Sequence, residues 1–346
     1  MRAAVLEKLN SPLTIADVEP GPIGTGQALV KVLVSGICGS QLQEIAGNKG
    51  NGKFLPHMLG HEGCGIVEET GPGISTVKKG DKVVMHWRKG DGVEADFPVY
   101  SFAGRTMRSG KVTTFNQYAI VSENRVTAVP ADTPEDFCAL LGCGLSTALG
   151  TMIDEAKVRP GESVLIVGIG GLGASLVRAA QLVGASPIIA IDIVEAKRGT
   201  AASLGADLFI DASTEDARDA IKDLLGTPEV DVIVETSGRP KSIASTLPLL
   251  GSGGRYILVG QPQPGESVEI ANAYHLFGGE GKSIIATQGG QFLPSRDIPR
   301  YTRLQKAGRL RFDDLITHRT TLDGVNDAIG LMRSGRANRM FIDLWS

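Results

Sequence analysis

The stretch SVLIVGIGGLG, residues 163–173, decides the fold of this chain. Its first half is a short apolar run typical of a buried strand, and its second half is a glycine-rich turn that leads into a helical pattern over residues 172–183. The glycines recur as Gly-x-Gly-x-x-Gly, a spacing that lets the backbone turn sharply and approach a bound group closely. A strand, such a turn and a helix in this order predict the first βαβ unit of a dinucleotide-binding sheet.

The alternation of strand and helix continues downstream of this turn. Short apolar runs separated by helical stretches are typical of a parallel sheet covered by helices on both faces. Further strands are predicted over residues 188–192, 207–210, 231–235, 255–260 and 282–287. With residues 163–167 they make six, so the predicted fold class is α/β, with a doubly wound Rossmann sheet of six parallel strands.

The glycine turn and the end of the second strand carry the predicted nucleotide contacts. The turn offers backbone N–H groups at a helix N-terminus to a pyrophosphate, and its members are Gly168, Ile169, Gly170, Gly171, Leu172 and Gly173. Asp192 ends the second strand about 20 residues further on, where a carboxylate accepts hydrogen bonds from ribose hydroxyls and repels a 2′-phosphate. NAD is therefore favoured over NADP, although the nearby cations Lys197 and Arg198 make this preference less sharp. The alternative interpretation is a surface glycine turn beside a solvated aspartate.

The segments on either side of this sheet have a different character. Before it, short β-branched runs bounded by Gly, Pro and Asp predict strands over residues 28–34, 65–68, 82–85 and 118–121. After it, the sequence predicts strands over residues 313–316 and 340–344 and a helix over residues 325–334. This order predicts a nucleotide-binding domain inserted into a β-rich domain, with segments at residues 1–145, 146–287 and 288–346.

Three residues far apart in the β-rich segment form a candidate metal site. Cys38, His61 and Cys143 each lie in a glycine-rich setting. Two thiols and one imidazole are a three-ligand zinc set that leaves one tetrahedral position open, which is typical of a catalytic rather than a structural zinc. The other two of the four cysteines, Cys64 and Cys138, do not match the pattern and are interpreted as buried small hydrophobes.

Composition narrows the remaining possibilities. The 346 residues carry a formal charge of −3, which gives no reason to expect nucleic acid or a membrane surface as a partner. Residues 1–20 lack the pattern of a secretory signal, and no apolar run reaches the roughly 18 residues of a membrane span. We therefore expect a cytoplasmic protein, whose cysteines are metal ligands or buried hydrophobes rather than disulfides.

The order of these motifs resembles that of the zinc-containing alcohol dehydrogenases of the medium-chain dehydrogenase/reductase superfamily. The resemblance spans essentially the whole chain and is carried by Cys38, residues 60–62, residues 80–83, Cys143, the glycine turn and residues 331–339. It implies a β-rich, GroES-like catalytic domain into which the Rossmann domain is inserted. It also implies hydride transfer between NAD and a secondary alcohol or its ketone.

The resemblance implies roles for single residues at the metal site. The zinc ligands would be Cys38, His61 and Cys143. Glu62 would be a carboxylate able to enter the metal shell, and Ser40 would be the hydroxyl that binds the substrate oxygen and starts a proton relay.

Further roles concern the cofactor and the substrate pocket. The resemblance places Thr147 beside the nicotinamide, Lys197 near the ribose and Arg339 near the phosphates. Trp87 would form a wall of the substrate pocket or else pack in the core, and His86 either touches substrate or is an ordinary polar histidine at a strand end.

Two departures from the family pattern follow Ser40. Many relatives carry an aspartate one position later, which holds the zinc-bound histidine, and a histidine two positions beyond that, which ends the relay. This chain has Gln41 and Gln43 there. A neutral amide should orient His61 less strongly than a carboxylate does, and water or a cofactor hydroxyl must finish the relay.

A third departure is the absence of cysteine between Met85 and Tyr118, where many relatives hold a structural zinc with four cysteines. We therefore expect one zinc per chain. The charged residues 88–111 are either a solvated loop or a cover over the active site. As a cover they would favour a hydroxyl-rich substrate, such as a polyol, a cyclitol or a sugar derivative.

Two other functions stay open at this point. A metal-free quinone or enone reductase of the same superfamily is favoured only by Gln41, and a catalytically silent nucleotide-binding protein is disfavoured by the intact Ser40 and Glu62. The resemblance also implies a homodimer or homotetramer that pairs through the edge of the nucleotide sheet, near residues 253–260 and 282–287.

Overall fold

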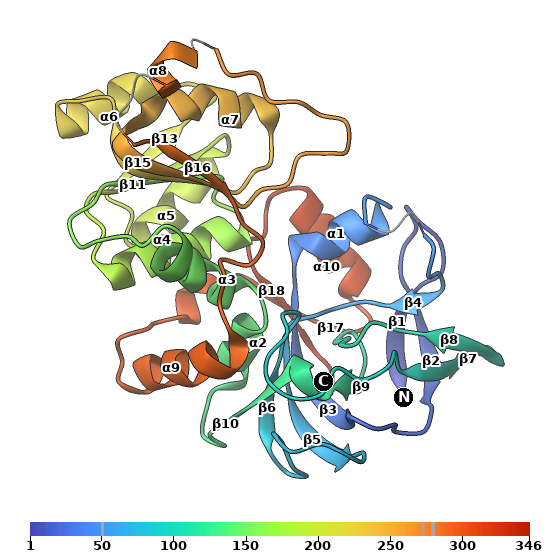
Figure 1. Cartoon of the computed structure of the whole chain (residues 1–346). Coiled ribbons are helices and arrows are strands. Elements are labelled where there is room, and N and C mark those ends of the chain that lie inside the picture. The colour runs from blue at the N-terminus through green and yellow to red at the C-terminus, as the bar shows by residue number, and fades with distance from the viewer. Residues whose placement is uncertain (50–51, 272, 278–280) are drawn as a thin grey trace. The chain divides into compact units, whose positions relative to one another are not determined.

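Two compact units make up the chain. The computed structural model describes residues 1–49, 52–271, 273–277 and 281–346 (Figure 1). Unit 1 comprises Met1–Ser146 and Leu293–Ser346, and unit 2 comprises Thr147–Phe292. The segment ends expected from the sequence, at residues 145 and 287, lie one and five residues before these boundaries.

Unit 2 contains the doubly wound parallel sheet that the sequence predicts. Its six strands stand in the order β13-β12-β11-β14-β15-β16, and every neighbouring pair is parallel. The strands are β11 (Val164–Val167), β12 (Ile188–Asp192), β13 (Leu208–Asp211), β14 (Val230–Glu235), β15 (Leu250–Leu258) and β16 (Ser283–Ala286). The helices are α4 (Gly171–Val183), α5 (Arg198–Leu204), α6 (Ala217–Leu225), α7 (Pro240–Thr246) and α8 (Ala273–Phe277), with 3₁₀ turns at Glu195–Lys197 and Leu247–Leu249 and a π-helical turn at Thr151–Glu155.

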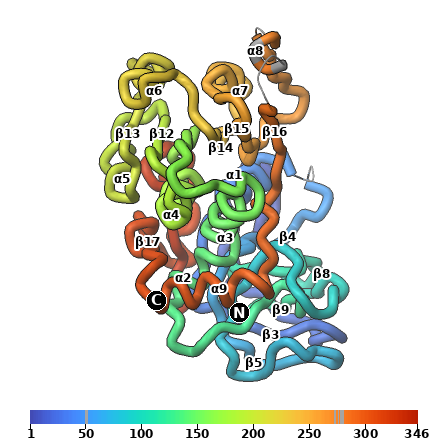
Figure 2. The backbone as a smooth tube through the Cα atoms, turned by 60° about the vertical axis from the view of Figure 1, so that its left-hand side comes forward, coloured from blue at the N-terminus to red at the C-terminus, as the bar shows by residue number. Residues whose placement is uncertain are grey.

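The sequence of the central strand explains this arrangement. All four residues of β11 are buried, because α4 and α5 cover one face of the sheet while α6 and α7 cover the other (Figures 1 and 2). Such two-sided burial requires a continuous apolar run rather than an alternating one. The fold class predicted from the sequence is confirmed.

Unit 1 is built from two sheets that are mainly antiparallel. One sheet has the order β4-β1-β2-β7-β8, and the other has the order β10-β6-β5-β3-β18-β17, with β9 also paired to β3. The strands are β1 (Arg2–Leu6), β2 (Thr14–Pro20), β3 (Gln27–Ile37), β4 (His57–Met58), β5 (Gly63–Thr70), β6 (Lys82–Met85), β7 (Val99–Phe102), β8 (Arg105–Arg108), β9 (Tyr118–Ser122), β10 (Val126–Val129), β17 (His318–Thr321) and β18 (Met340–Asp343). The helices of this unit are α1 (Gly39–Ile45), α2 (Glu135–Leu141), α9 (Pro294–Lys306) and α10 (Val325–Arg333), with 3₁₀ turns at Glu123–Arg125 and Asp313–Leu315, and α3 (Gly144–Gly150) crosses the unit boundary.

The core of unit 1 fixes the end of β3. Val30, Val32 and Ile37 of this strand are buried in one apolar cluster with residues of β6 and β18. Ile37 is paired with Met340 of β18, so the last strand of the chain lies against the residue that precedes Cys38. Burial of this cluster holds the start of α1 in place.

The strand predicted over residues 313–316 is wrong. Asp313–Leu315 form a 3₁₀ turn in which Leu315 N–H donates to Phe312 O at 3.0 Å. Two consecutive aspartates disfavour a strand, and the turn buries Leu315 instead. The strand of this region is β17, which begins at His318.

The charged segment at residues 88–111 is tied to unit 1. Its second half forms the hairpin β7–β8, which extends β2. The buried carboxylate of Glu123 accepts hydrogen bonds from the backbone N–H of Ser75, Thr76 and Val93 at 2.7–2.8 Å. Residues near Val93 are therefore held against the end of β9 rather than solvated on all sides.

No single helix of the described residues is long and apolar enough to cross a bilayer. The segments Glu135–Leu141 and Gly144–Glu155 pass that test only as a bent pair, by length and composition.

Candidate active site

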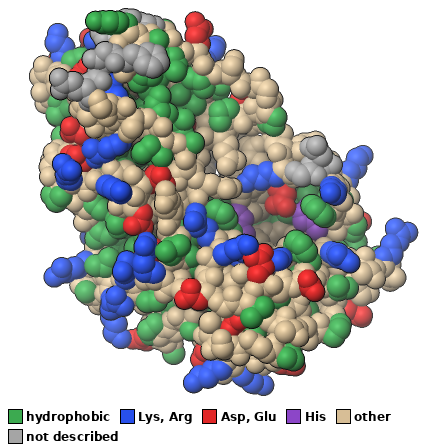
Figure 3. All heavy atoms as spheres, viewed as in Figure 1, with side chains coloured by type: hydrophobic (Ala, Val, Ile, Leu, Met, Phe, Trp, Pro, Cys, Tyr) green, Lys and Arg blue, Asp and Glu red, His purple; other side chains and the backbone are tan. Residues whose placement is uncertain are grey.

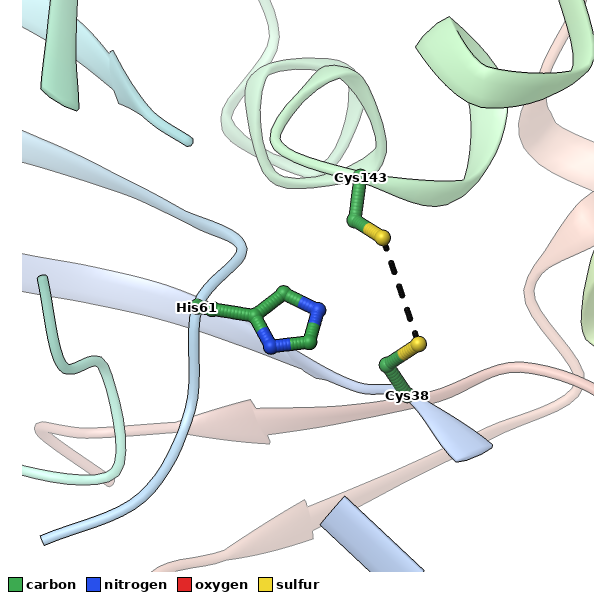
Figure 4. Close-up of side chains that lie close together, drawn as sticks. All are labelled: Cys38, His61 and Cys143. Carbon is green, nitrogen blue, oxygen red and sulfur yellow. Dashed lines mark hydrogen bonds between the residues drawn. The ribbon is translucent and has the colours of Figure 1, made fainter. Parts of the chain in front are cut away.

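The three candidate metal ligands come together in unit 1 and point toward one another (Figure 4). Their ligand atoms lie within 4.8 Å of one another, and the two sulfurs of Cys38 and Cys143 are 4.0 Å apart. Tetrahedral zinc with Zn–S bonds of about 2.3 Å separates two sulfurs by roughly 3.8 Å. The Nε2 atom of His61 is buried and has no hydrogen-bond partner among the residues that the structure describes. The residues present therefore fit a zinc ion.

Each ligand stands at the end of an element. Cys38 follows β3 and is the N-cap of α1, and Cys143 lies between α2 and α3. His61 lies between β4 and β5, after Gly60, whose φ of +89° is in the left-handed region that favours glycine. These ends are fixed by the sheets of unit 1, so the ligand set does not depend on long flexible loops.

The pKa values of the two thiols shift in opposite directions, which leaves a negative charge at Cys38 that suits a bound cation. The pKa of Cys38 is well below its ordinary value, chiefly because of its hydrogen bond with Cys143, and His61 lowers it further. The same hydrogen bond, with burial, raises the pKa of Cys143. Burial lowers the pKa of His61, but the neighbouring Cys38 outweighs burial and raises it, against the opposing charge of Lys49. A thiolate at Cys38 is the form that ligates metal.

Gln41 controls which nitrogen of His61 carries the proton. The backbone N–H of Cys38 donates to Gln41 Oε1 at 3.0 Å, so the amide nitrogen of Gln41 faces His61 Nδ1 at 2.7 Å. An amide nitrogen only donates, and a neutral His61 then carries its proton on Nε2. Metal binding needs a lone pair on Nε2. Loading zinc therefore requires the Gln41 amide to reverse, which removes the acceptor of the Cys38 N–H.

Replacing Gln41 by glutamate should increase zinc affinity by about tenfold or more, since outer contacts of this kind change metal affinity 10–100-fold. Both oxygens of a carboxylate can accept hydrogen bonds. One can keep the hydrogen bond from Cys38 N–H while the other accepts a hydrogen bond from His61 Nδ1–H. Competition with a fluorescent zinc chelator measures the dissociation constant. Gln41→Leu is the matched control of similar size and should weaken binding; an unchanged affinity in Gln41→Glu would contradict the argument.

Ser40 lies beside the same imidazole. Its Oγ is 3.4 Å from His61 Nδ1 and accepts a hydrogen bond from Gln41 Nε2 at 3.3 Å. Its own O–H is thus left to donate to another oxygen. Gln43 is exposed and accepts from Asn48 Nδ2 at 2.7 Å, so it serves the turn after α1.

Glu62 and Arg339, 277 positions apart in the chain, form a buried ion pair that no sequence pattern predicts. Arg339 Nη1 donates to Glu62 Oε1 at 2.6 Å, and both side chains are at most 3% exposed. Burial raises the pKa of Glu62, and the charge of Arg339 opposes that rise. A Cβ added at Gly144 would overlap the guanidinium, which explains the glycine there. The role of Arg339 at the cofactor phosphates stays a prediction.

The candidate pocket wall Trp87 is half-buried. Its indole Nε1 is buried and has no partner in the described part of the chain, and Arg88 lies over the ring at 5.7 Å. His86, the preceding residue, is fully buried; Nδ1 donates to Arg88 O at 2.7 Å, and Nε2 accepts from Thr127 Oγ1 at 2.9 Å. With both nitrogens engaged, His86 holds the end of β6 to β10 and has a structural role.

Acidification should destabilise the fold through His86. Burial lowers the pKa of His86 from 6.5 to about 4. Between these values the unfolded chain binds a proton that the folded chain does not, so the free energy of unfolding falls as the pH falls. From pH 7 to pH 5 this loss is about 2 kcal/mol. Urea unfolding at both pH values should show a smaller loss for His86→Gln than for the wild type and for the exposed control His318→Gln; equal losses in all three would contradict the prediction.

The glycine turn of unit 2 has the form that a pyrophosphate needs. Gly168 has a φ of +88°, and a Cβ at Gly173 would overlap the carbonyl oxygen of Gly168. A Cβ at Gly170 would meet no atom of the described residues within 4 Å, so there is open space next to the N-cap of α4. The residues present fit the phosphates of a dinucleotide.

Asp192 links this turn to the next strand. Its Oδ2 accepts from Ile169 N–H at 2.7 Å and from Lys197 Nζ at 2.9 Å, and its Oδ1 accepts from Val194 N–H at 3.1 Å. Lys197 thus lies at the carboxylate predicted to bind the ribose. Thr147 belongs to α3 at the start of unit 2 and is buried.

Comparisons with known proteins agree with this architecture. Residues 24–131 match the alcohol dehydrogenase GroES-like domain, and residues 171–307 match the zinc-binding dehydrogenase family. Alcohol dehydrogenase 6 of Peromyscus maniculatus is 32% identical over 367 aligned residues, covering 98% of this chain and 96% of that protein.

Similar solved structures cover the whole chain. An alcohol dehydrogenase zinc-binding domain protein from Burkholderia ambifaria has a TM-score of 0.92 and 30% identity, and covers 100% of this chain and 99% of that one. Benzyl alcohol dehydrogenase from Acinetobacter calcoaceticus has a TM-score of 0.89 and 29% identity, with 99% of each chain covered.

A Rossmann sheet inserted into a GroES-like domain with a Cys–His–Cys cluster defines the class of medium-chain dehydrogenases. The chain belongs to the zinc-containing alcohol dehydrogenase family of that superfamily and is an oxidoreductase of this type. The family resemblance drawn from the sequence is confirmed.

Proposed function

We propose that the chain is a zinc-dependent dehydrogenase that transfers a hydride between NAD and a secondary alcohol or its ketone. The observation that carries this proposal is the cluster of Cys38, His61 and Cys143, with a buried imidazole Nε2 that lacks a partner among the described residues. When bound by these ligands, zinc supplies a Lewis acid that polarises an alcohol or carbonyl oxygen.

Ser40 moves the proton of the alcohol in this proposal. Its Oγ lies 3.4 Å from Nδ1 of the ligand His61, and this position beside the ligand set supports a hydrogen bond between the Ser40 hydroxyl and the substrate oxygen. The buried pair of Glu62 and Arg339 keeps a carboxylate near the ligands without leaving its charge uncompensated. Gln43 has no imidazole, so the proton passes from Ser40 to water or to a cofactor hydroxyl.

NAD is the proposed cofactor. Asp192 supports this choice, because a carboxylate at the end of the second strand accepts from ribose hydroxyls and repels a 2′-phosphate. The proposed substrate is hydroxyl-rich: a polyol, a cyclitol or a sugar derivative. Assembly into a homodimer or homotetramer is part of the same proposal, and the place of β16 at the end of the strand order supports it.

The experiment that tests this function is metal content followed by an activity screen. Elemental mass spectrometry on protein never exposed to chelator should find about one zinc per chain. Polyols, cyclitols and sugar alcohols should then reduce NAD, while benzyl alcohol serves as the comparison substrate. A zinc content near zero would favour the metal-free reductase, for which the neutral contact of Gln41 to His61 is the supporting observation.

A further inference from the structure

Unit 1 has a separate pocket that draws part of its lining from α1, the helix that begins at the metal ligand Cys38. It has a volume of about 270 Å³, near the lower end of ligand sites at roughly 300–1,000 Å³. Its polar lining consists of Glu44, Lys49, Lys53, His57, Arg108 and Ser109. On this face, basic side chains surround a hollow in which histidine and acidic side chains gather (Figure 3).

The pocket has an excess of positive charge. Lys49, Lys53 and Arg108 are exposed, and within residues 1–49, 52–271, 273–277 and 281–346 none of them has a carboxylate partner. The carboxylate of Glu44 is already engaged by His57 Nε2 at 2.8 Å. Three cations around one opening favour an anionic group.

Two buried polar atoms of the pocket lack hydrogen-bond partners in the described part of the structure: His57 Nδ1 and Ser109 Oγ. Ser109 is only 5% exposed. Because Glu44 accepts from His57 Nε2–H, the other ring nitrogen, Nδ1, is left to form a hydrogen bond with a ligand. A ligand with hydroxyl groups satisfies both atoms, whereas an apolar ligand leaves both unpaired at a cost.

The pocket shares elements with the metal site. Glu44 belongs to α1, whose N-cap is the metal ligand Cys38. His57 lies four positions before the ligand His61, and its ring is joined to α1 through Glu44. A group held in this pocket can therefore belong to the molecule whose oxygen meets the ligands.

We propose that this pocket binds the anionic, hydroxyl-bearing end of the substrate, a phosphate or a carboxylate, between Lys49, Lys53 and Arg108. Hydroxyl groups next to the anion bind His57 Nδ1 and Ser109 Oγ. This inference rests on the proposed function for the reacting end of the molecule, and it narrows the substrate class to acidic or phosphorylated polyols. A neutral alcohol would leave three cations without a counter-charge and bind more weakly.

Calorimetry on the zinc-loaded protein, with and without saturating NADH, tests the pocket independently of turnover. The probes are sorbitol, sorbitol 6-phosphate and gluconate. At least one of the two anions should bind about tenfold or more tightly than sorbitol. The anion that binds more tightly shows whether the pocket prefers a phosphate or a carboxylate. Arg108→Ala should weaken the anion about tenfold and leave sorbitol unchanged. Arg105→Ala is the matched control, since Arg105 is also exposed on β8 but lies outside the pocket.

Equal binding of sorbitol and both anions, or the same loss in Arg105→Ala as in Arg108→Ala, would overturn the proposal. Ser109→Ala should weaken all three probes, and no effect there would remove the hydroxyl contact. Tight, Arg108-dependent binding without NADH formation from any probe supports the pocket and contradicts the proposed function. NADH formation from neutral alcohols, with no tighter binding of anions, supports the proposed function and contradicts the proposed pocket.

Discussion

Replacing Cys143 by alanine is expected to reduce the zinc content from about one per chain to below about 0.1. The variant keeps only two of the three ligands, and Cys38 loses the hydrogen bond that lowers its pKa. Loss of the group that stabilises charge on the substrate oxygen should lower kcat by about a thousandfold or more. Elemental mass spectrometry and NADH absorbance at saturating NAD measure the two effects.

Cys138→Ala is the matched control for this experiment. Cys138 lies in α2, five positions before Cys143, and is fully buried. Its replacement by alanine also removes a thiol from this region, but not one of the three ligands. It should keep both the zinc and the activity, with a loss of about 1 kcal/mol in the free energy of unfolding. Zinc retained in Cys143→Ala, or lost in Cys138→Ala, would contradict the assignment of the ligands.

Replacing Asp192 by asparagine should change the ratio of kcat/KM for NAD to that for NADP by about a hundredfold or more. The amide oxygen can still accept from Ile169 N–H, so the glycine turn keeps its support. The charge that repels a 2′-phosphate is gone, and Lys197, freed from its ion pair, can meet that phosphate. The loss for NAD alone is about tenfold, the strength of one charge-assisted hydrogen bond.

Asp211→Asn controls for this substitution. Asp211 ends the neighbouring strand β13, directly opposite Asp192 in the register, and accepts from Ser213 instead. Steady-state kinetics with both cofactors should leave its preference unchanged. A preference that shifts equally in both variants would show that a general loss of negative charge, rather than the position of Asp192, sets the cofactor.

The central strands β11 and β12 of the parallel sheet were predictable because they are buried on both faces. A run such as Val164–Val167 has no solvent-facing residue, so it can be recognised as a buried strand without knowledge of the strands next to it. In unit 1, β2 has only one buried residue in seven, and β17 has none. Such strands exist because other strands pair with them, and a local pattern cannot show this. The strand predicted over residues 313–316 was wrong because it was inferred from a local apolar pair alone. The tertiary context of this segment instead favours a 3₁₀ turn that buries Leu315.

The candidate site was predictable where a motif carries it. Cys38, His61 and Cys143 were found because ligand chemistry restricts the residue types and glycines frame each of them. The partner of Glu62 was missed, since no spacing rule connects residues 62 and 339. No sequence motif marks His57, although β4 brings its ring to Glu44. Contacts of this kind depend on which strands become neighbours.

The placement of β18 inside the sheet, between β3 and β17, bears on how the chain is made in the cell. Synthesis proceeds from the N-terminus, so β3 lacks its partner β18, and Glu62 lacks the charge of Arg339, until residues 339–343 have been made. Residues 147–292 are contiguous and can fold as they emerge. A message cut before the codons for Arg339 and β18 would thus yield a folded nucleotide domain attached to an unfinished unit 1 with exposed thiols, a suitable target for chaperones and proteases.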